Sequence, residues 1–209
     1  MPILLLVPLL ALLGAPQISS AATQQNALPT AVAAVTAVPF YSQFTDISSP
    51  TWKKVGCGVT SLAMLIDFYK PDSVSVNTLL QQGIQAGAYL QKAGWTYAGL
   101  IGLSKKYGLE GTSYDLGKLS TSAALAQFQM HLKDGPVMAS VHYKFDPKST
   151  IPHLVVINKI ENGIVYYNDP AAKSGNLKIS VADFQKGWKK RYIVIRPVKN
   201  PVDLATLAT

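Results

Sequence analysis

Cys57 is the only cysteine in this chain of 209 residues, and it lies between Gly56 and Gly58 where a helix is expected to begin. Two glycines leave the sulfur with little side-chain cover, and a helix N-terminus favours the thiolate over the thiol. Most free cysteines are instead small buried core residues. A single cysteine allows neither an internal disulfide nor a cysteine-based zinc cluster. We interpret Cys57 as a candidate nucleophile, with packing as the alternative role.

A nucleophilic thiol needs a general base, and the chain contains three histidines, His131, His142 and His153. His131 falls within an expected helix, where packing or surface exposure is the usual role. His142 falls within an expected strand and is a weaker candidate. His153 opens the strand His-Leu-Val-Val-Ile beside the loop 147–152, and catalytic side chains are commonly mounted where strands meet loops. We therefore predict that His153 is the base.

The residue that orients this histidine depends on a hairpin turn. If residues 161–163 (Glu-Asn-Gly) form a three-residue loop, Asp169 shares a sheet face with His153 and is its diagonal neighbour. A two-residue loop would bring Asn168 to that face instead. An acid in this place could hold the imidazole in one tautomer and stabilise its positive form. The turn therefore decides between Asp169 and Asn168.

The elements that must position these residues fall into two groups. Apolar residues spaced three or four apart predict four helices in the first part, at 57–69, 76–86, 97–107 and 120–133. Short apolar or alternating runs then predict strands at 137–143, 153–160, 164–168 and 192–196, with a helix at 180–187. A helical half packed on an antiparallel sheet is an α+β architecture.

The N-terminal residues differ from the rest of the chain. Residues 3–15 are apolar and uncharged, and small residues follow at 19–22, as in the core and exit of a secretory signal peptide. We expect cleavage after Ala22, with an uncleaved membrane anchor as the alternative. The expected organisation is a signal peptide at 1–22, a spacer at 23–36, a domain at 37–198 and a tail at 199–209.

Export and charge bear on both the site and the partners. A lone thiol outside the cell would be oxidised or scavenged unless it had a use, which favours a catalytic Cys57. Seventeen lysines and two arginines outnumber eleven acidic residues, which gives a net charge of +8. They are scattered and not clustered with aromatic residues, so nucleic-acid binding is not expected. Two explanations of the positive charge are open: solvated lysines on the surface of an exported protein, or attraction of the protein to anionic polymers.

Four stretches of the chain together resemble one known family: 38–43 (Val-Pro-Phe-Tyr-Ser-Gln), 56–64 (Gly-Cys-Gly-Val-Thr-Ser-Leu-Ala-Met), 152–157 (Pro-His-Leu-Val-Val-Ile) and 168–170 (Asn-Asp-Pro). Their order and spacing resemble the double-glycine leader peptidases, family 39 of the papain-like cysteine peptidases, in the stand-alone branch without a transporter. The resemblance implies a papain-like fold over about 38–197. Val59 stands where the family often has proline.

The resemblance also implies roles for individual residues. Cys57 would be the nucleophile, His153 the general base and Asp169 the orienting acid. Gln43, fourteen residues before Cys57, matches the family glutamine that donates to the oxyanion hole. The expected function is that of a secreted cysteine peptidase acting through a thioester acyl-enzyme.

Two other functions remain open at this stage. One is a Cys-His amidase or endopeptidase that cuts peptidoglycan peptides and meets the cell-wall polymer. The other is a peptide-binding module without catalysis. We expect a monomer with a peptide or protein substrate, no cofactor and no metal, and contact with a membrane only through an uncleaved signal.

Overall fold

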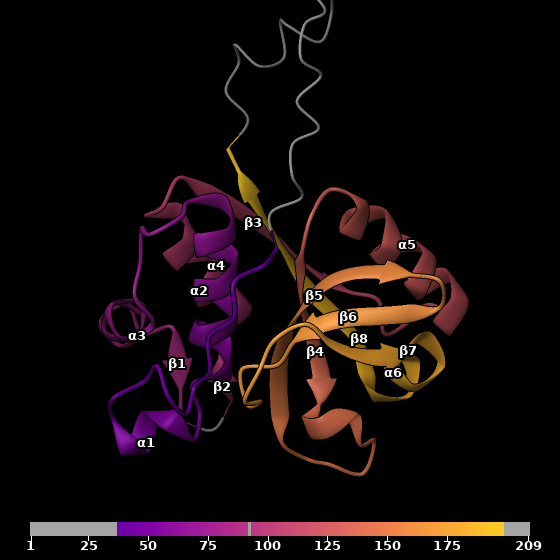
Figure 1. Ribbon diagram of the computed structural model, residues 1–209, viewed down its shortest axis with the longest axis horizontal. Helices are drawn as coiled ribbons and strands as arrows, with labels where there is room; N and C mark the ends of the chain where they lie inside the picture. The colour runs from indigo at the N-terminus through magenta and orange to yellow at the C-terminus, as the bar shows by residue number, and fades with distance from the viewer. Residues whose placement is uncertain (1–36, 92, 199–209) are drawn as a thin grey trace, which may run out of the picture. The chain divides into compact units, whose positions relative to one another are not determined.

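Two groups of elements make up the part of the chain that the computed structural model describes, residues 37–91 and 93–198 (Figure 1). The first group is mainly helical and the second is an antiparallel sheet with two helices, which is the predicted α+β class. The helix predicted at 120–133 was expected in the helical half, but it packs with the sheet group. The expected signal peptide, spacer and tail (1–22, 23–36 and 199–209) lie outside the described residues. Within the described residues, no helix combines the length and apolar character needed to cross a membrane.

The helical group contains four helices and a short ribbon of two strands. The helices are α1 (Pro50–Lys53), α2 (Cys57–Tyr69), α3 (Val76–Gln85) and α4 (Tyr97–Lys105). Strands β1 (Tyr89–Leu90) and β2 (Gly94–Trp95) pair with each other. Helix α2 is buried along nearly its whole length and ends just before Pro71, because proline cannot continue a helix. Its position confirms the predicted helix at 57–69.

The sheet group has six strands in the order β3-β8-β4-β5-β6-β7, and every neighbouring pair is antiparallel. The strands are β3 (Leu109–Asp115), β4 (Val137–His142), β5 (Pro152–Glu161), β6 (Ile164–Asn168), β7 (Leu177–Ser180) and β8 (Trp188–Pro197). Helices α5 (Thr121–Lys133) and α6 (Val181–Gly187) and the 3-10 helix η1 (Tyr143–Phe145) complete the group.

Alternate residues of the sheet enter two hydrophobic cores. Leu154 and Val156 of β5 join the core that contains α2, α3 and α4. Val155 and Ile157 join the core that contains Phe128 of α5 and side chains of α6. The helical group therefore covers one face of the sheet, and α5 and α6 cover the other (Figure 1). Because β5 is buried on both faces, its first residues are held firmly beside α2.

The turn between β5 and β6 has the shorter of the two loop lengths that the sequence left open. Glu161 pairs with Ile164, so only Asn162 and Gly163 form the turn. Both have positive φ angles, 50° and 75°, as the type I′ turn of a two-residue hairpin requires. The register then shifts at a bulge between Ile157 and Lys159, so that Val156 pairs with Asn168. The bulge restores the register that a three-residue loop would have produced.

Candidate active site

His153 and Asp169 form a short buried hydrogen bond. Nε2 of His153 lies 2.6 Å from Oδ1 of Asp169, and both residues are buried. Asp169 Oδ1 also accepts a hydrogen bond from the backbone N–H of Ala171, at 2.8 Å, which fixes the carboxylate. The ring of Tyr143, from η1, meets the imidazole edge to face, with centroids 5.3 Å apart. Because Nε2 is bonded to Asp169, Nδ1 is the ring nitrogen that stays available for another partner.

Burial and hydrogen bonding act in opposite directions on this imidazole. Burial has the largest single effect and lowers the pKa of His153. The hydrogen bonds of the imidazole with Asp169 and Cys57, together with the charges of both groups, raise the pKa by more than burial lowers it. The net result is a pKa raised from the ordinary 6.5 to about 9. A pKa of about 9 favours the protonated imidazole at neutral pH, and Cys57 is near enough to contribute to the shift.

Cys57 is the first residue of α2, where backbone N–H groups lack acceptors within the helix. The positive end of the helix dipole lies at this residue. The flanking glycines have a packing role that sequence reasoning did not identify. A Cβ on Gly58 would lie 2.7 Å from the Trp95 side chain, and one on Gly56 would overlap Ile47. Small residues are thus required on both sides of the cysteine.

Gln43 reaches the site from the segment before α1. Its side-chain Nε2 donates to the carbonyl oxygen of Lys53 at 2.7 Å, and its backbone N–H donates to Pro170 O at 2.8 Å. The first bond fixes the orientation of the Gln43 side-chain amide. The second bond holds the segment beside the loop that contains Asp169. Nε2 has a second N–H, while the buried Oε1 has no hydrogen-bond partner among the described residues.

Asn168 does not contact the imidazole. Its Nδ2 donates to the carbonyl oxygens of Val38 and Pro39, and its Oδ1 accepts from the backbone of Asn176 at 2.7 Å. Its role is to attach the N-terminal segment of the domain to the end of β6. Of the two orienting residues that the sequence left open, the structure places Asp169 beside His153.

The other two histidines lie outside the site. Nδ1 of His131 is 2.9 Å from the hydroxyl oxygen of Tyr192, and the imidazole packs against Tyr114. Nδ1 of His142 is 2.8 Å from the carbonyl oxygen of Ser149. Neither histidine lines the cleft that contains Cys57. Both have local hydrogen-bonding roles.

A cleft of about 720 Å³ brings Gln43, Cys57 and His153 together on one surface. The sequence analysis missed the β1–β2 ribbon and Tyr143, which also line it. Two-residue strands are too short to give a periodic signal. Trp95 is buried and lines the cleft as well, and its Nε1 donates to Val55 O at 2.7 Å.

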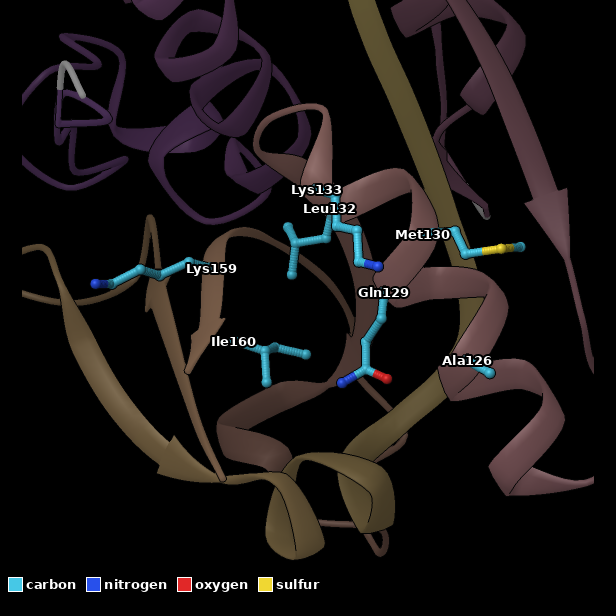
Figure 2. Close-up of a pocket in the computed structure, with 7 residues that line it drawn as sticks. All are labelled: Ala126, Gln129, Met130, Leu132, Lys133, Lys159 and Ile160. Atoms are coloured by element: carbon cyan, nitrogen blue, oxygen red, sulfur yellow. The ribbon is translucent and has the colours of Figure 1, made fainter. Parts of the chain in front are cut away.

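A second hollow, of about 510 Å³, lies between α5 and β5. Figure 2 shows Gln129 and Leu132 of α5 facing Ile160 of β5 across it. Its lining residues include two lysines and no histidine, cysteine or carboxylate. Within the described residues, no group of three or more histidine, cysteine or acidic side chains could hold a metal ion.

Comparison with solved structures shows a shared fold. A double glycine motif protease from an AMS/PCAT transporter, in complex with its leader peptide, is 22% identical with a TM-score of 0.53, and the match covers 78% of this chain and 94% of that one. The peptidase domain of Streptococcus ComA, a bi-functional ABC transporter involved in a quorum sensing pathway, is 22% identical with a TM-score of 0.52 over 69% of this chain and 93% of that one.

A C39-like peptidase from Bacillus anthracis is 19% identical with a TM-score of 0.54, and the match covers 78% of this chain and 96% of that one. No curated protein matches the sequence. The model of the Peptidase_C39 like family matches residues 35–196, which is most of the chain and nearly all of its described part. The α+β structure is accordingly papain-like, and the chain belongs to the Peptidase_C39 like family of cysteine peptidases.

Proposed function

We propose that this protein hydrolyses peptide bonds with Cys57 as nucleophile, His153 as general acid and base, and Asp169 as the orienting acid. The observation that carries the proposal is the buried His153–Asp169 hydrogen bond of 2.6 Å beside a cleft that Cys57 also lines. The solved AMS/PCAT protease bound to a leader peptide supports a peptide as the substrate class. Cys57 at the start of α2 supports a reactive sulfur.

In the first half of the reaction, the Cys57 thiolate attacks the carbonyl carbon of the peptide bond and forms a C–S bond. Electrons shift to the carbonyl oxygen, toward which the second N–H of Gln43 Nε2 and the backbone N–H of Cys57 would donate. One such donor typically stabilises the transition state by about 2.7 to 4 kcal/mol. The tetrahedral intermediate collapses, the C–N bond breaks, and the proton on His153 passes to the leaving amine. A thioester remains on Cys57.

In the second half, neutral His153 takes a proton from water, whose oxygen attacks the thioester carbonyl. The C–S bond breaks, a carboxylic acid leaves, and Cys57 returns as a thiolate beside a protonated imidazole. Asp169 keeps Nε2 of His153 occupied, so Nδ1 is the nitrogen that exchanges protons. Tyr143 packs edge-on to the ring and limits its rotation.

We also propose that the peptidase is exported. The apolar, uncharged segment 3–15 followed by small residues supports a cleaved signal peptide. Expression of the full chain with mass spectrometry of the mature N-terminus tests this. A mature chain beginning at or near Thr23 is the expected result, and retention of Met1 on an intracellular product would refute export.

The peptidase proposal is tested by comparing the wild-type protein with Cys57→Ala and Cys57→Ser on casein and on a peptide library. We expect the wild type to cleave and both variants to be inactive with unchanged thermal unfolding. A thioester trapped at low pH should add the mass of the acyl fragment to the peptide that contains Cys57. Cleavage that survives in Cys57→Ala would refute the assignment. Peptide binding without cleavage by the wild type would instead identify a binding module.

A further inference from the structure

Besides His153, the described residues that line the active-site cleft include three cationic side chains and no carboxylate. They are Lys54, on the link between α1 and α2, and Lys189 and Arg191, at the beginning of β8. Within the described part of the chain, Lys54 and Lys189 form no ion pair. The cleft therefore has a positive lining that nothing in the proposed hydrolysis requires.

A β-bulge sets the direction of the two cations on β8. Ser140 of β4 pairs with Arg191, but the next residue, Val141, pairs with Trp188, so β8 has two extra residues at this point. Lys190 has a φ of 54°, and its Nζ donates to the carbonyl oxygen of Leu119 at 2.8 Å, outside the cleft. Bulges beside active sites commonly redirect side chains, and here Lys189 and Arg191 on either side of Lys190 both line the cleft.

Arg191 forms one ion pair through its Nε, and its terminal guanidinium nitrogens remain available as donors. Its Nε lies 2.8 Å from Oδ2 of Asp115, and more than half of each side chain is exposed. Asp115 itself is not among the residues that line the cleft. The two terminal nitrogens of the guanidinium can therefore bind a second carboxylate in the bidentate manner that favours arginine.

The sheet register gives the distance of these cations from the chemistry. Ser140 pairs with both Leu154 of β5 and Arg191 of β8, so Arg191 is two strands away from the residue that follows His153. Two strand spacings are about 10 Å, and an extended peptide advances about 3.3 Å per residue. A peptide side chain that meets Lys189 or Arg191 therefore belongs to a residue about two or three positions from the scissile bond.

We propose that the cleft selects peptides with an aspartate or glutamate about two or three residues from the bond that is cut. The carboxylate would be held by Lys189 and Arg191, with Lys54 adding positive potential from the opposite wall. As a statement about turnover this rests on the proposed peptidase function, but as a statement about binding it does not. The test is designed so that the two can fail separately.

The binding experiment uses the Cys57→Ala variant and a set of fluorescent peptides that differ at one position. That position carries glutamate, glutamine or lysine, and it is moved in turn through the three residues on each side of a preferred cleavage site. For a wild type without detectable cleavage, the same substitutions are made along a peptide selected from the library by Cys57→Ala. We expect at least one position where glutamate binds about tenfold more tightly than glutamine, as two exposed charge pairs would produce. The preference should weaken between about 0.01 M and about 1 M salt, where the screening length falls from about 30 Å to about 3 Å.

Substitutions then assign the preference to particular side chains. Lys189→Gln and Arg191→Gln should each reduce the ratio of glutamate to glutamine affinity about threefold, whereas Lys189→Arg should retain it. Lys105→Gln, on the exposed end of α4 and outside the cleft lining, is the matched control and should have no effect. Unchanged thermal unfolding of each variant excludes misfolding as the cause.

The same peptides are assayed for turnover by the wild type. A tenfold ratio of kcat/KM for glutamate over glutamine extends the proposal to catalysis. Selective binding without turnover would refute the peptidase proposal and leave the selectivity intact. Equal affinity of Cys57→Ala for the glutamate and glutamine peptides at every position, or a preference that Lys189→Gln and Arg191→Gln leave unchanged, would refute the acidic selectivity.

Discussion

Replacement of Asp169 by asparagine should shift the alkaline limit of activity, because Asp169 is a main cause of the raised pKa of His153. In the wild type, burial lowers this pKa, but the hydrogen bonds and charges of Asp169 and Cys57 raise it to about 9. The active pair of thiolate and protonated imidazole should therefore persist until the pH approaches 9. Asparagine preserves the shape of the side chain and removes its charge.

The magnitude follows from the two pKa values. With a pKa of about 9, the imidazole is about nine-tenths protonated at pH 8. If the pKa fell to the ordinary 6.5, only about 3% would be protonated at that pH. The resulting loss of about thirtyfold at pH 8 is an upper limit, because Cys57 still raises the pKa in Asp169→Asn. Below pH 6 this part of the loss should disappear.

The assay is a profile of kcat/KM against pH, from about 5 to 10, for the wild type and Asp169→Asn on one peptide. Asp183→Asn is the matched control, since Asp183 is an exposed aspartate at the start of α6 outside the cleft. We expect the alkaline limb of Asp169→Asn to move to lower pH while that of Asp183→Asn stays near 9. An alkaline limb that remains near 9 in Asp169→Asn would refute the role of the carboxylate in setting the charge of the imidazole.

Four further predictions concern stability and the support of the site. Because the pKa of His153 is raised on folding, its contribution to stability is complete below about 6.5 and should be lost as the pH rises through about 9, which urea unfolding across that range measures. Gly58→Ala forces a Cβ to 2.7 Å from Trp95 and should lower the free energy of unfolding by about 1 to 3 kcal/mol in the same assay; an unchanged value would show that Trp95 moves freely. Asn168→Ala removes hydrogen bonds to the backbone of Val38, Pro39 and Asn176 and should cost about 1 to 3 kcal/mol, with a larger loss of activity than of binding, in calorimetry and kinetics. Tyr143→Ala should reduce kcat about two- to tenfold with little change in KM, and Tyr143→Phe should retain activity, because it keeps the ring that packs T-shaped with His153.

The elements that carry Cys57 and His153 could be predicted from the sequence because their patterns are local. Cys57 starts a helix whose apolar spacing is regular, and His153 is the second residue of β5 and precedes a run of apolar residues. Asp169 is a different case. A two-residue turn was expected to bring Asn168 to His153, but the bulge at Asn158 compensates for the shorter turn and brings Asp169 there. A bulge depends on packing between strands and leaves no reliable trace in a single sequence.

Other parts of the structure gave no usable pattern. Strand β3 is largely exposed beyond Leu109 and lacks the apolar alternation that predicts a strand, and β7 alternates over only four residues, which is too short to stand out. The positive lining of the cleft was hidden for a different reason. Lys54 is far in sequence from Lys189 and Arg191, and only the folded chain and the bulge in β8 bring them to one surface.

The central claim is that Cys57 is activated by His153 and the start of α2. The most direct measurement is the rate of Cys57 alkylation by iodoacetamide against pH, in the wild type and in His153→Ala. We expect the wild type to be alkylated at mildly acidic pH and this reactivity to be lost in His153→Ala. Alkylation of the wild type that begins only near pH 8, with the same profile in both proteins, would contradict it.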